Sequence, residues 1–92
     1  MKRRAVKEAT LIRYLLGKLS ERKRLELENL YFADDDLYEA LCVAERELID
    51  RYVYGELSRA ERKRFKSHFL VSDSRRQKTR FALELKQHFL KS

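Results

Sequence analysis

Imidazole and thiol groups are scarce in this chain of 92 residues: its histidines are His68 and His88, and its cysteine is Cys42. A structural zinc site needs four ligands, usually thiolates and imidazoles, so these residues do not suggest one by themselves. A single cysteine cannot form an internal disulfide, and we expect a reduced, buried side chain in a cytoplasmic protein. We expect His68 in a helix seam and His88 in an exposed last turn, and assign no chemistry to either.

Three consecutive carboxylates, Asp34, Asp35 and Asp36, are the next candidates for chemistry, because such groups bind divalent cations. An EF-hand spreads its ligands over about twelve residues, with a glycine in the loop and a closing glutamate. The sequence lacks that pattern. We therefore expect the run to cap helices and solvate a loop, and we predict no metal and no cofactor.

Motifs of an enzyme active site are also missing. The sequence has no Gly-rich phosphate loop, no Cys and His pair in a catalytic context and no nucleophile motif. A domain of this length has a thin core, which leaves little room for a substrate pocket. The sequence therefore predicts a protein that is not an enzyme.

Cations dominate the chemistry of the chain but are unevenly distributed. Lys and Arg number 22 against 15 Asp and Glu, a net charge of +7. Residues 1–50 carry a net charge of −1, and residues 51–92 carry +8. Within the first half, residues 21–50 carry −6. The second half therefore favours an acidic partner or nucleic acid. No apolar run approaches the ~20 residues that span a bilayer, so direct membrane insertion is not expected.

Four cations, Arg75, Arg76, Lys78 and Arg80, crowd the first turns of a predicted helix. The helix dipole disfavours a cation there by about 0.3–1 kcal/mol at low salt. We expect compensation from the run of aspartates at 34–36 or from an acidic partner. These four residues are therefore predicted to bind a partner.

A second basic stretch is expected to be a solvated face, because helical spacing spreads its members around the cylinder. Its members are Arg59, Arg62, Lys63, Arg64 and Lys66.

Most of the ten aromatic residues are expected to lie in the core. We leave Tyr38 and Tyr54 as predicted surface anchors for a partner, because Tyr often serves interfaces.

Helices must position these groups, because apolar residues recur at helical spacing and the chain has no Pro and two Gly. We predict an all-α fold, a small bundle of about five helices. Their expected ranges are 7–16, 21–32, 37–54, 59–70 and 75–90. The third is apolar over a wide arc and should be central. On the fifth helix, Phe81, Leu85 and Phe89 share one face, which we expect to be buried. Replacing Phe81, or Leu48 of the third helix, with Asp should therefore unfold the domain, because it would bury an unpaired charge.

The helix boundaries rest on local signals. Gly17 and Gly55 are expected just past helix ends, where glycine tolerates positive φ. Serines at 20 and 58 are predicted N-caps, the second with Glu61 in a capping box. The same pattern predicts N-caps for the third and fifth helices at residues 36 and 74.

An internal repeat organises these signals. Residues 14–20 read Y-L-L-G-K-L-S and residues 52–58 read Y-V-Y-G-E-L-S, at an offset of 38. Such self-similarity indicates a repeated supersecondary unit. We predict one helical domain, residues 1–92, built from two similar helix–Gly–helix repeats at about 11–48 and 49–86. The third helix belongs to both.

The string G-[KE]-L-S, followed after two or three residues by Arg and then by an aromatic residue or Leu, resembles the zinc-associated anti-sigma factors. The resemblance covers nearly the whole chain, once per repeat. In that family the capped helix carries H-x-x-x-C-x-x-C, and His68 falls at the histidine. The family's cysteine positions hold Ser72 and Arg75 here. The matching positions of the first repeat are Leu30, Asp34 and Leu37.

The missing cysteines decide what the resemblance implies about metal. It implies tandem degenerate copies that lack the zinc cysteines, with apolar and capping contacts in place of zinc. Family members commonly hold a sigma factor inactive by embracing it with these helices. The resemblance thus implies a zinc-free, cytoplasmic protein-binding module of bacterial transcription regulation, whose partner is a sigma factor or another acidic protein.

Two other functions remain open from the sequence. The net charge favours a basic helical nucleic-acid-binding protein as the alternative, with the fourth and fifth helices imitating a helix-turn-helix and residues 75–80 leading the second. A third reading is self-assembly, in which the acidic first repeat of one copy pairs head to tail with the basic second repeat of another.

Overall fold

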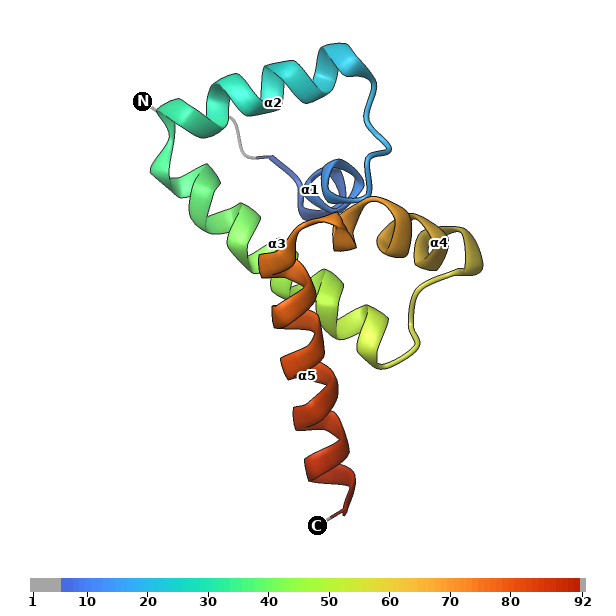
Figure 1. Ribbon diagram of the computed structural model, residues 1–92. Coiled ribbons are helices and arrows are strands. Elements are labelled where there is room, and N and C mark those ends of the chain that lie inside the picture. Colours follow the sequence, from blue (N-terminus) through green and yellow to red (C-terminus); the bar gives the residue numbers. More distant parts are fainter. Residues whose placement is uncertain (1–5, 92) are drawn as a thin grey trace.

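The computed structural model describes residues 6–91, so residues 1–5 and 92 of the predicted domain lie outside it. Over that range the fold is all-α, as predicted, and contains no strand (Figure 1). A 3₁₀ turn, η1, separates the last two α-helices. The elements are α1 (Glu8–Leu15), α2 (Glu21–Ala33), α3 (Asp35–Val53), α4 (Arg59–Ser67), η1 (Phe69–Val71) and α5 (Asp73–Lys91).

Helix α3 is the central element, because it contacts α1, α2 and α5. Its residues Ala44 and Leu48 are fully buried, and this confirms the prediction from its wide apolar arc. Aromatic rings extend the core toward α4: the ring centroids of Tyr52 and Phe65 lie 4.2 Å apart, and those of Phe65 and Phe69 lie 4.7 Å apart. The core consists of Leu11, Ile12, Leu15, Leu16, Leu27, Leu37, Ala44, Leu48, Ile49, Val53, Leu57, Phe65 and Phe69.

The two glycine junctions have the same backbone geometry. Gly17 and Gly55 have φ of 71° and 72°, in the left-handed region that favours glycine. Both junctions close with the paired hydrogen bonds of a Schellman motif, and Ser20 and Ser58 then cap α2 and α4. The four bonds run from the amides of Gly17, Lys18, Gly55 and Glu56 to the carbonyls of Tyr14, Arg13, Tyr52 and Arg51.

The elements after the two junctions differ. Helix α2 has 13 residues and buries Leu27, whereas α4 has 9 residues, buries Phe65 and leads into η1, which buries Phe69. The predicted fourth helix, 59–70, is therefore a shorter helix plus a 3₁₀ turn. The likeness of the halves is seen in the junctions, and the prediction of two similar repeats is not confirmed.

Two N-caps lie two residues before their predicted positions. Asp34, not Asp36, caps α3: its Oδ1 accepts from the amides of Asp36 and Leu37 at 2.9 and 3.3 Å. For α5 the Ser72 hydroxyl, not that of residue 74, accepts from a first-turn amide. The physical reason is the same in both cases. Aspartates just after the cap are favourable in the first turn beside the positive end of the helix dipole, so each helix starts earlier.

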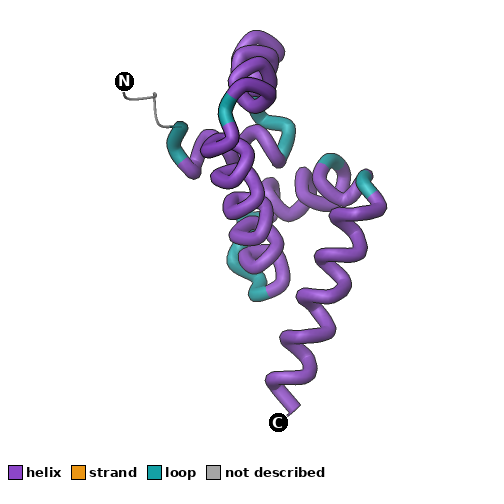
Figure 2. The backbone as a smooth tube through the Cα atoms, turned by 90° about the vertical axis from the view of Figure 1, so that its left-hand side faces the viewer, coloured by secondary structure: helices purple, strands orange, loops and turns teal. Residues whose placement is uncertain are grey.

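The described chain is elongated, with extents of 49 × 26 × 22 Å and a radius of gyration of 14.4 Å. A compact domain of this length would have a radius of gyration of about 12 Å. The difference arises because α2 and the second half of α5 lie at opposite ends of the long axis (Figures 1 and 2). Both helices pack against the rest by one side.

The prediction that Phe81, Leu85 and Phe89 form a buried face of α5 is wrong. Their exposed fractions are 62%, 41% and 71%. Helix α5 instead meets α3 through smaller side chains, with Thr79 buried and Ala82 packed on the edge of the core. An apolar row on a helix indicates a face that is more stable when buried, but the surface that buries it need not belong to the same chain.

Candidate protein-binding surfaces

Glu45 on α3 neutralises two of the four cations at the start of α5. Lys78 Nζ donates to Glu45 Oε1 at 2.8 Å, and Arg75 Nε donates to Oε2 at 3.3 Å. The Arg75 guanidinium also lies 4.5 Å from the ring centroid of Phe69. The carboxylate that compensates Arg75 and Lys78 is therefore Glu45, and not one of the aspartates of residues 34–36 that we expected. These contacts fasten α5 to α3.

Arg76 fastens α5 to the preceding turn. Its Nη1 donates to the carbonyls of Leu70 and Val71 at 2.8 and 3.1 Å, and its guanidinium pairs with Asp73. Arg80 is exposed to solvent. Three of the four predicted partner-binding cations thus have contacts within the fold, and a role for the set in binding a partner stays a prediction.

The two predicted tyrosine anchors belong to different surfaces. Tyr38 and Tyr54 are 51% and 56% exposed, as a surface role requires. They lie near the two ends of α3, about 24 Å apart along a helix axis that rises roughly 1.5 Å per residue. Each tyrosine therefore has its own set of neighbours.

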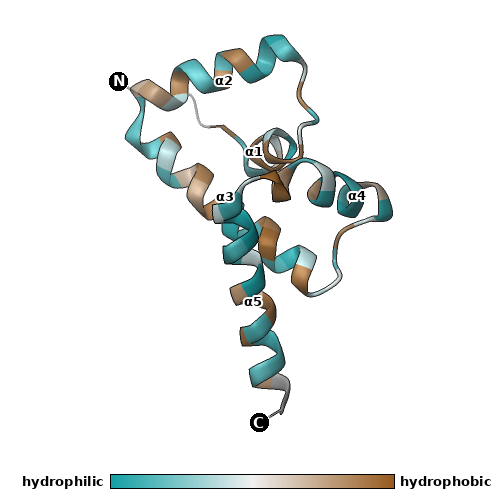
Figure 3. Ribbon diagram, in the orientation of Figure 1, coloured by the Kyte–Doolittle hydropathy of each residue, from teal (hydrophilic) through white to brown (hydrophobic). Residues whose placement is uncertain are grey.

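Tyr38 belongs to an aromatic corner, which we define as Tyr31, Phe32 and Tyr38, where α2 meets α3. The ring of Tyr31 lies 5.6 Å, between centroids, from each of the other two rings. Phe32 is 84% exposed. The segment 25–39 that contains the corner holds six carboxylates and no Lys or Arg. Figure 3 shows apolar positions alternating with strongly polar ones at this end of the molecule. The corner is an exposed apolar surface in an acidic setting.

Cys42 lies one helical turn after Tyr38 and is a free, half-buried thiol, whereas we predicted a buried one. The pKa of Tyr38 is raised above its ordinary value, chiefly by the electrostatic effect of the neighbouring Cys42 side chain and further by a hydrogen bond between the two side chains. Tyr38 therefore stays a neutral phenol at physiological pH and presents an uncharged ring at the corner.

A second apolar surface is the α5 row, which we define as Phe81, Leu85 and Phe89. Successive members are four residues apart, so they follow one side of the helix. Their exposure, given above, increases toward the projecting end for the two phenylalanines. Residues 75–91 contain six cations and one carboxylate, so this surface lies in a basic setting. The row and the corner thus combine exposed apolar side chains with opposite charge.

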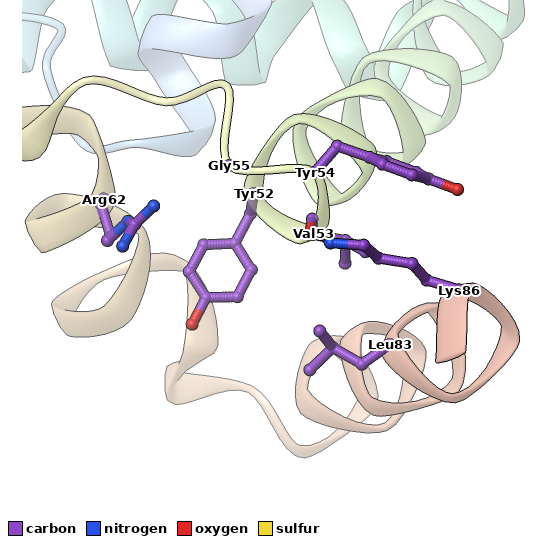
Figure 4. Close-up of a pocket in the computed structure, with 7 residues that line it drawn as sticks. All are labelled: Tyr52, Val53, Tyr54, Gly55, Arg62, Leu83 and Lys86. Atoms are coloured by element: carbon purple, nitrogen blue, oxygen red, sulfur yellow. Dashed lines mark hydrogen bonds between the residues drawn. The ribbon is translucent and has the colours of Figure 1, made fainter. Parts of the chain in front are cut away.

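Tyr54 lines a shallow, open pocket of about 240 Å³ between the end of α3 and α5 (Figure 4). Lys86 Nζ donates to the Val53 carbonyl at 2.8 Å and lies 5.1 Å from the Tyr54 ring centroid. The lysine thus stabilises the negative end of α3. The lining residues are Tyr52, Val53, Tyr54, Gly55, Arg62, Leu83 and Lys86, which include no carboxylate, imidazole or thiol. The pocket suits an apolar contact better than acid–base chemistry.

Four of the six positions that match the ligands of the zinc family have other structural roles in this fold. Ser72 caps α5 and Arg75 pairs with Glu45, while Asp34 caps α3 and Leu37 is buried. Within the part of the chain that the structure describes, no group of three or more His, Cys, Asp or Glu residues is placed to hold a metal ion.

Two residues of the candidate surfaces were not predicted from the sequence, Glu45 and Phe32. Glu45 carries no signal that separates it from other acidic residues of α3, because its role depends on where α5 crosses. Phe32 did carry one: it is a large apolar residue two positions before the run of aspartates, where a buried position is unfavourable. None of the helices in residues 6–91 is both long and apolar enough to cross a membrane.

Comparisons with known proteins add no relative. The sequence matches no protein-family model, and it gives no significant match to a curated protein or to a solved structure. The resemblance to anti-sigma factors therefore rests on the motif residues alone, and function has to be argued from the surfaces.

Proposed function

We propose that this chain is a non-enzymatic, cytoplasmic regulatory module that binds a protein partner through the α5 row. The observation that carries the proposal is the exposure of Phe81, Leu85 and Phe89 along one side of a projecting helix. Contiguous exposed apolar side chains bordered by polar ones mark interaction sites on soluble proteins. Burial against a partner removes this apolar surface from water, which favours association.

This arrangement suits a binding mode in which α5 lies in a groove on the partner protein. An amphipathic helix binds such a groove through apolar anchors at successive turns, which is the spacing of the α5 row. The surrounding cations favour an acidic partner, mainly by raising the association rate. A sigma factor or another acidic protein fits this description, and the anti-sigma resemblance supports that class of partner. The proposal needs no zinc, because Ser72 and Arg75 form helix-stabilising contacts at the family's cysteine positions.

A pull-down tests this proposal with a matched control. The tagged full chain, its Phe81→Asp variant and its Val71→Asp variant are each incubated with nuclease-treated extract of the native host. Val71 is a suitable control because it is 67% exposed but lies on η1, outside the row. We expect one acidic protein, identified by mass spectrometry, to bind the wild type and Val71→Asp and to be lost with Phe81→Asp. Absence of any Phe81-dependent protein would refute the proposal.

A nucleic-acid-binding function is the second candidate, favoured by the exposure of the cations on α4. Arg59, Arg62, Lys63 and Lys66 are all exposed. Phosphate contacts by such residues would make affinity fall steeply with salt. Gel shifts on random duplex DNA at low salt decide this point: retardation that disappears with added salt supports the second function, and no retardation at low salt excludes it.

A further inference from the structure

We propose that two copies of this chain associate head to tail, with the α5 row of one copy docked on the aromatic corner of the other. This goes beyond the partner proposed above, because the occupant is a second copy. The two surfaces contain exposed large apolar side chains and lie toward opposite ends of the long axis. Their apolar content and their charge both fit one another.

The apolar match comes from large side chains on each side. The corner offers Phe32, which is 84% exposed, and Tyr38, which is 51% exposed. The row offers Phe81 and Leu85, which are 62% and 41% exposed. Aromatic residues such as these supply much of the binding energy where they are buried at the centre of an interface.

The charges around the two surfaces are opposite in sign. Residues 25–39, around the corner, contain six carboxylates and no Lys or Arg. Residues 75–91, along α5, contain six cations and one carboxylate. Facing charges of opposite sign speed association and fix its register. The clearest candidates for the rim are Glu39 beside the corner and Arg80 beside the row, both exposed.

The same charges disfavour symmetric dimers. Row against row would bring two basic helices together, and corner against corner would bring two acidic segments together. Like charges facing across an interface are costly, so the pairing of unlike surfaces is preferred. The occupant of the corner is therefore the α5 row of another copy.

The geometry makes this contact open-ended. The corner and the end of α5 lie at opposite ends of a molecule 49 Å long, so one chain cannot bring its own row to its own corner (Figures 1 and 2). Each bound pair still presents a free corner and a free row. A head-to-tail interface of this kind builds chains, or rings where the rotation closes.

Sedimentation and light scattering on the full chain test association directly. We expect the average mass to rise with concentration at low salt and to fall as salt is added, because the Debye length shortens from about 30 Å at 0.01 M to about 3 Å at 1 M. A mass that stays that of a monomer, 11.2 kDa, across concentration and salt would overturn the proposal.

Two blocked variants identify the surfaces. Phe32→Asn removes the corner and Phe81→Asp removes the row, while both positions are exposed and the fold should persist by circular dichroism. Each variant alone should be monomeric. Their equimolar mixture should stop at a dimer, because one intact row and one intact corner remain. Val71→Asp, the matched control, should associate like the wild type.

The alternative outcomes are distinct. If either blocked variant still associates as strongly as the wild type, or if the mixture fails to form dimers, the contact lies elsewhere and the proposal is wrong. Failure of the self-association proposal can be distinguished from failure of the proposed partner binding, because Phe32→Asn leaves the α5 row intact. That variant should lose self-association and still capture the partner protein.

Discussion

Gly17 and Gly55 provide a matched pair of substitutions that measures one tertiary contact. Their backbones are nearly identical, with φ of 71° and 72°. The surroundings differ: a β-carbon at Gly17 would lie 2.8 Å from both Cε1 and Nδ1 of His68, whereas one at Gly55 would meet nothing within 4 Å. Arg64 covers the same turn, donating to the Gly17 carbonyl at 3.1 Å. Helix α4 therefore packs on the first glycine turn and leaves the second open.

The expected magnitudes follow from these two environments. Alanine at positive φ costs roughly 1–2 kcal/mol, and the lower entropy of the unfolded chain returns about 0.4–1 kcal/mol, so Gly55→Ala should destabilise by about 1 kcal/mol. Gly17→Ala adds displacement of the His68 ring from its preferred rotamer, about 0.5–1.5 kcal/mol more. A loss of 1 kcal/mol lowers the melting temperature of a domain of this size by about 4–8 °C, so Gly17→Ala should melt several degrees lower than Gly55→Ala.

Urea and thermal unfolding followed by circular dichroism measure both variants, and a double-mutant cycle isolates the ring. In a His68→Ala background, Gly17→Ala should cost no more than Gly55→Ala, because the obstructing imidazole is gone. Equal losses for the two glycine variants in the wild-type background would refute the packing of His68 on Gly17. So would a Gly17–His68 coupling energy of zero.

Further predictions concern the core, the α3–α5 contact and the second capping box. Leu48→Asp should abolish cooperative unfolding because that side chain is fully buried, whereas Phe81→Asp should shift the melting temperature by only a few degrees. Glu45→Ala should destabilise by about 1–2 kcal/mol in urea unfolding, since it leaves two cations without their anion and the side chains are partly solvated. The Ser58 amide donates to Glu61 at 2.9 Å and lowers the pKa of that carboxylate. Because its pKa is lowered, the Glu61 carboxylate stabilises the fold at pH values above its ordinary pKa of about 4.3, and this stabilisation is lost as pH falls through its pKa in the folded state. Glu61→Gln should therefore flatten the dependence of the melting temperature on pH below about pH 4.3. An unchanged dependence would contradict this.

Local signals predicted the helices well because their causes lie within a few residues. The φ > 0 glycines, the Ser20 and Ser58 caps and the capping box with Glu61 all appear in the structure as expected. The starts of α3 and α5 were misplaced by two residues, because aspartate is favourable both as a cap and in the first turn. Side-chain type alone does not choose between these two positions.

The candidate surfaces were less predictable, because they depend on what each helix finds to pack against. The exposure of Tyr38 and Tyr54 agrees with their selection as surface anchors. The α5 row was recognised as one face, but assigned to the core, since its spacing is the same whether the partner is this chain or another. The association of Arg75 and Lys78 with Glu45, 30 and 33 residues away, has no local signal at all.

The sequence by itself determined an all-α chain, the turns at its two glycines, a central third helix and the separation of acidic and basic segments. Each of these follows from side-chain periodicity, backbone freedom or composition, which are properties of neighbouring residues. The tertiary structure alone decided that α5 rests on α3 through Thr79 and Ala82 and leaves its large apolar side chains in solvent. That outcome depends on the crossing of two helices, and burial is a property of the whole arrangement rather than of any segment.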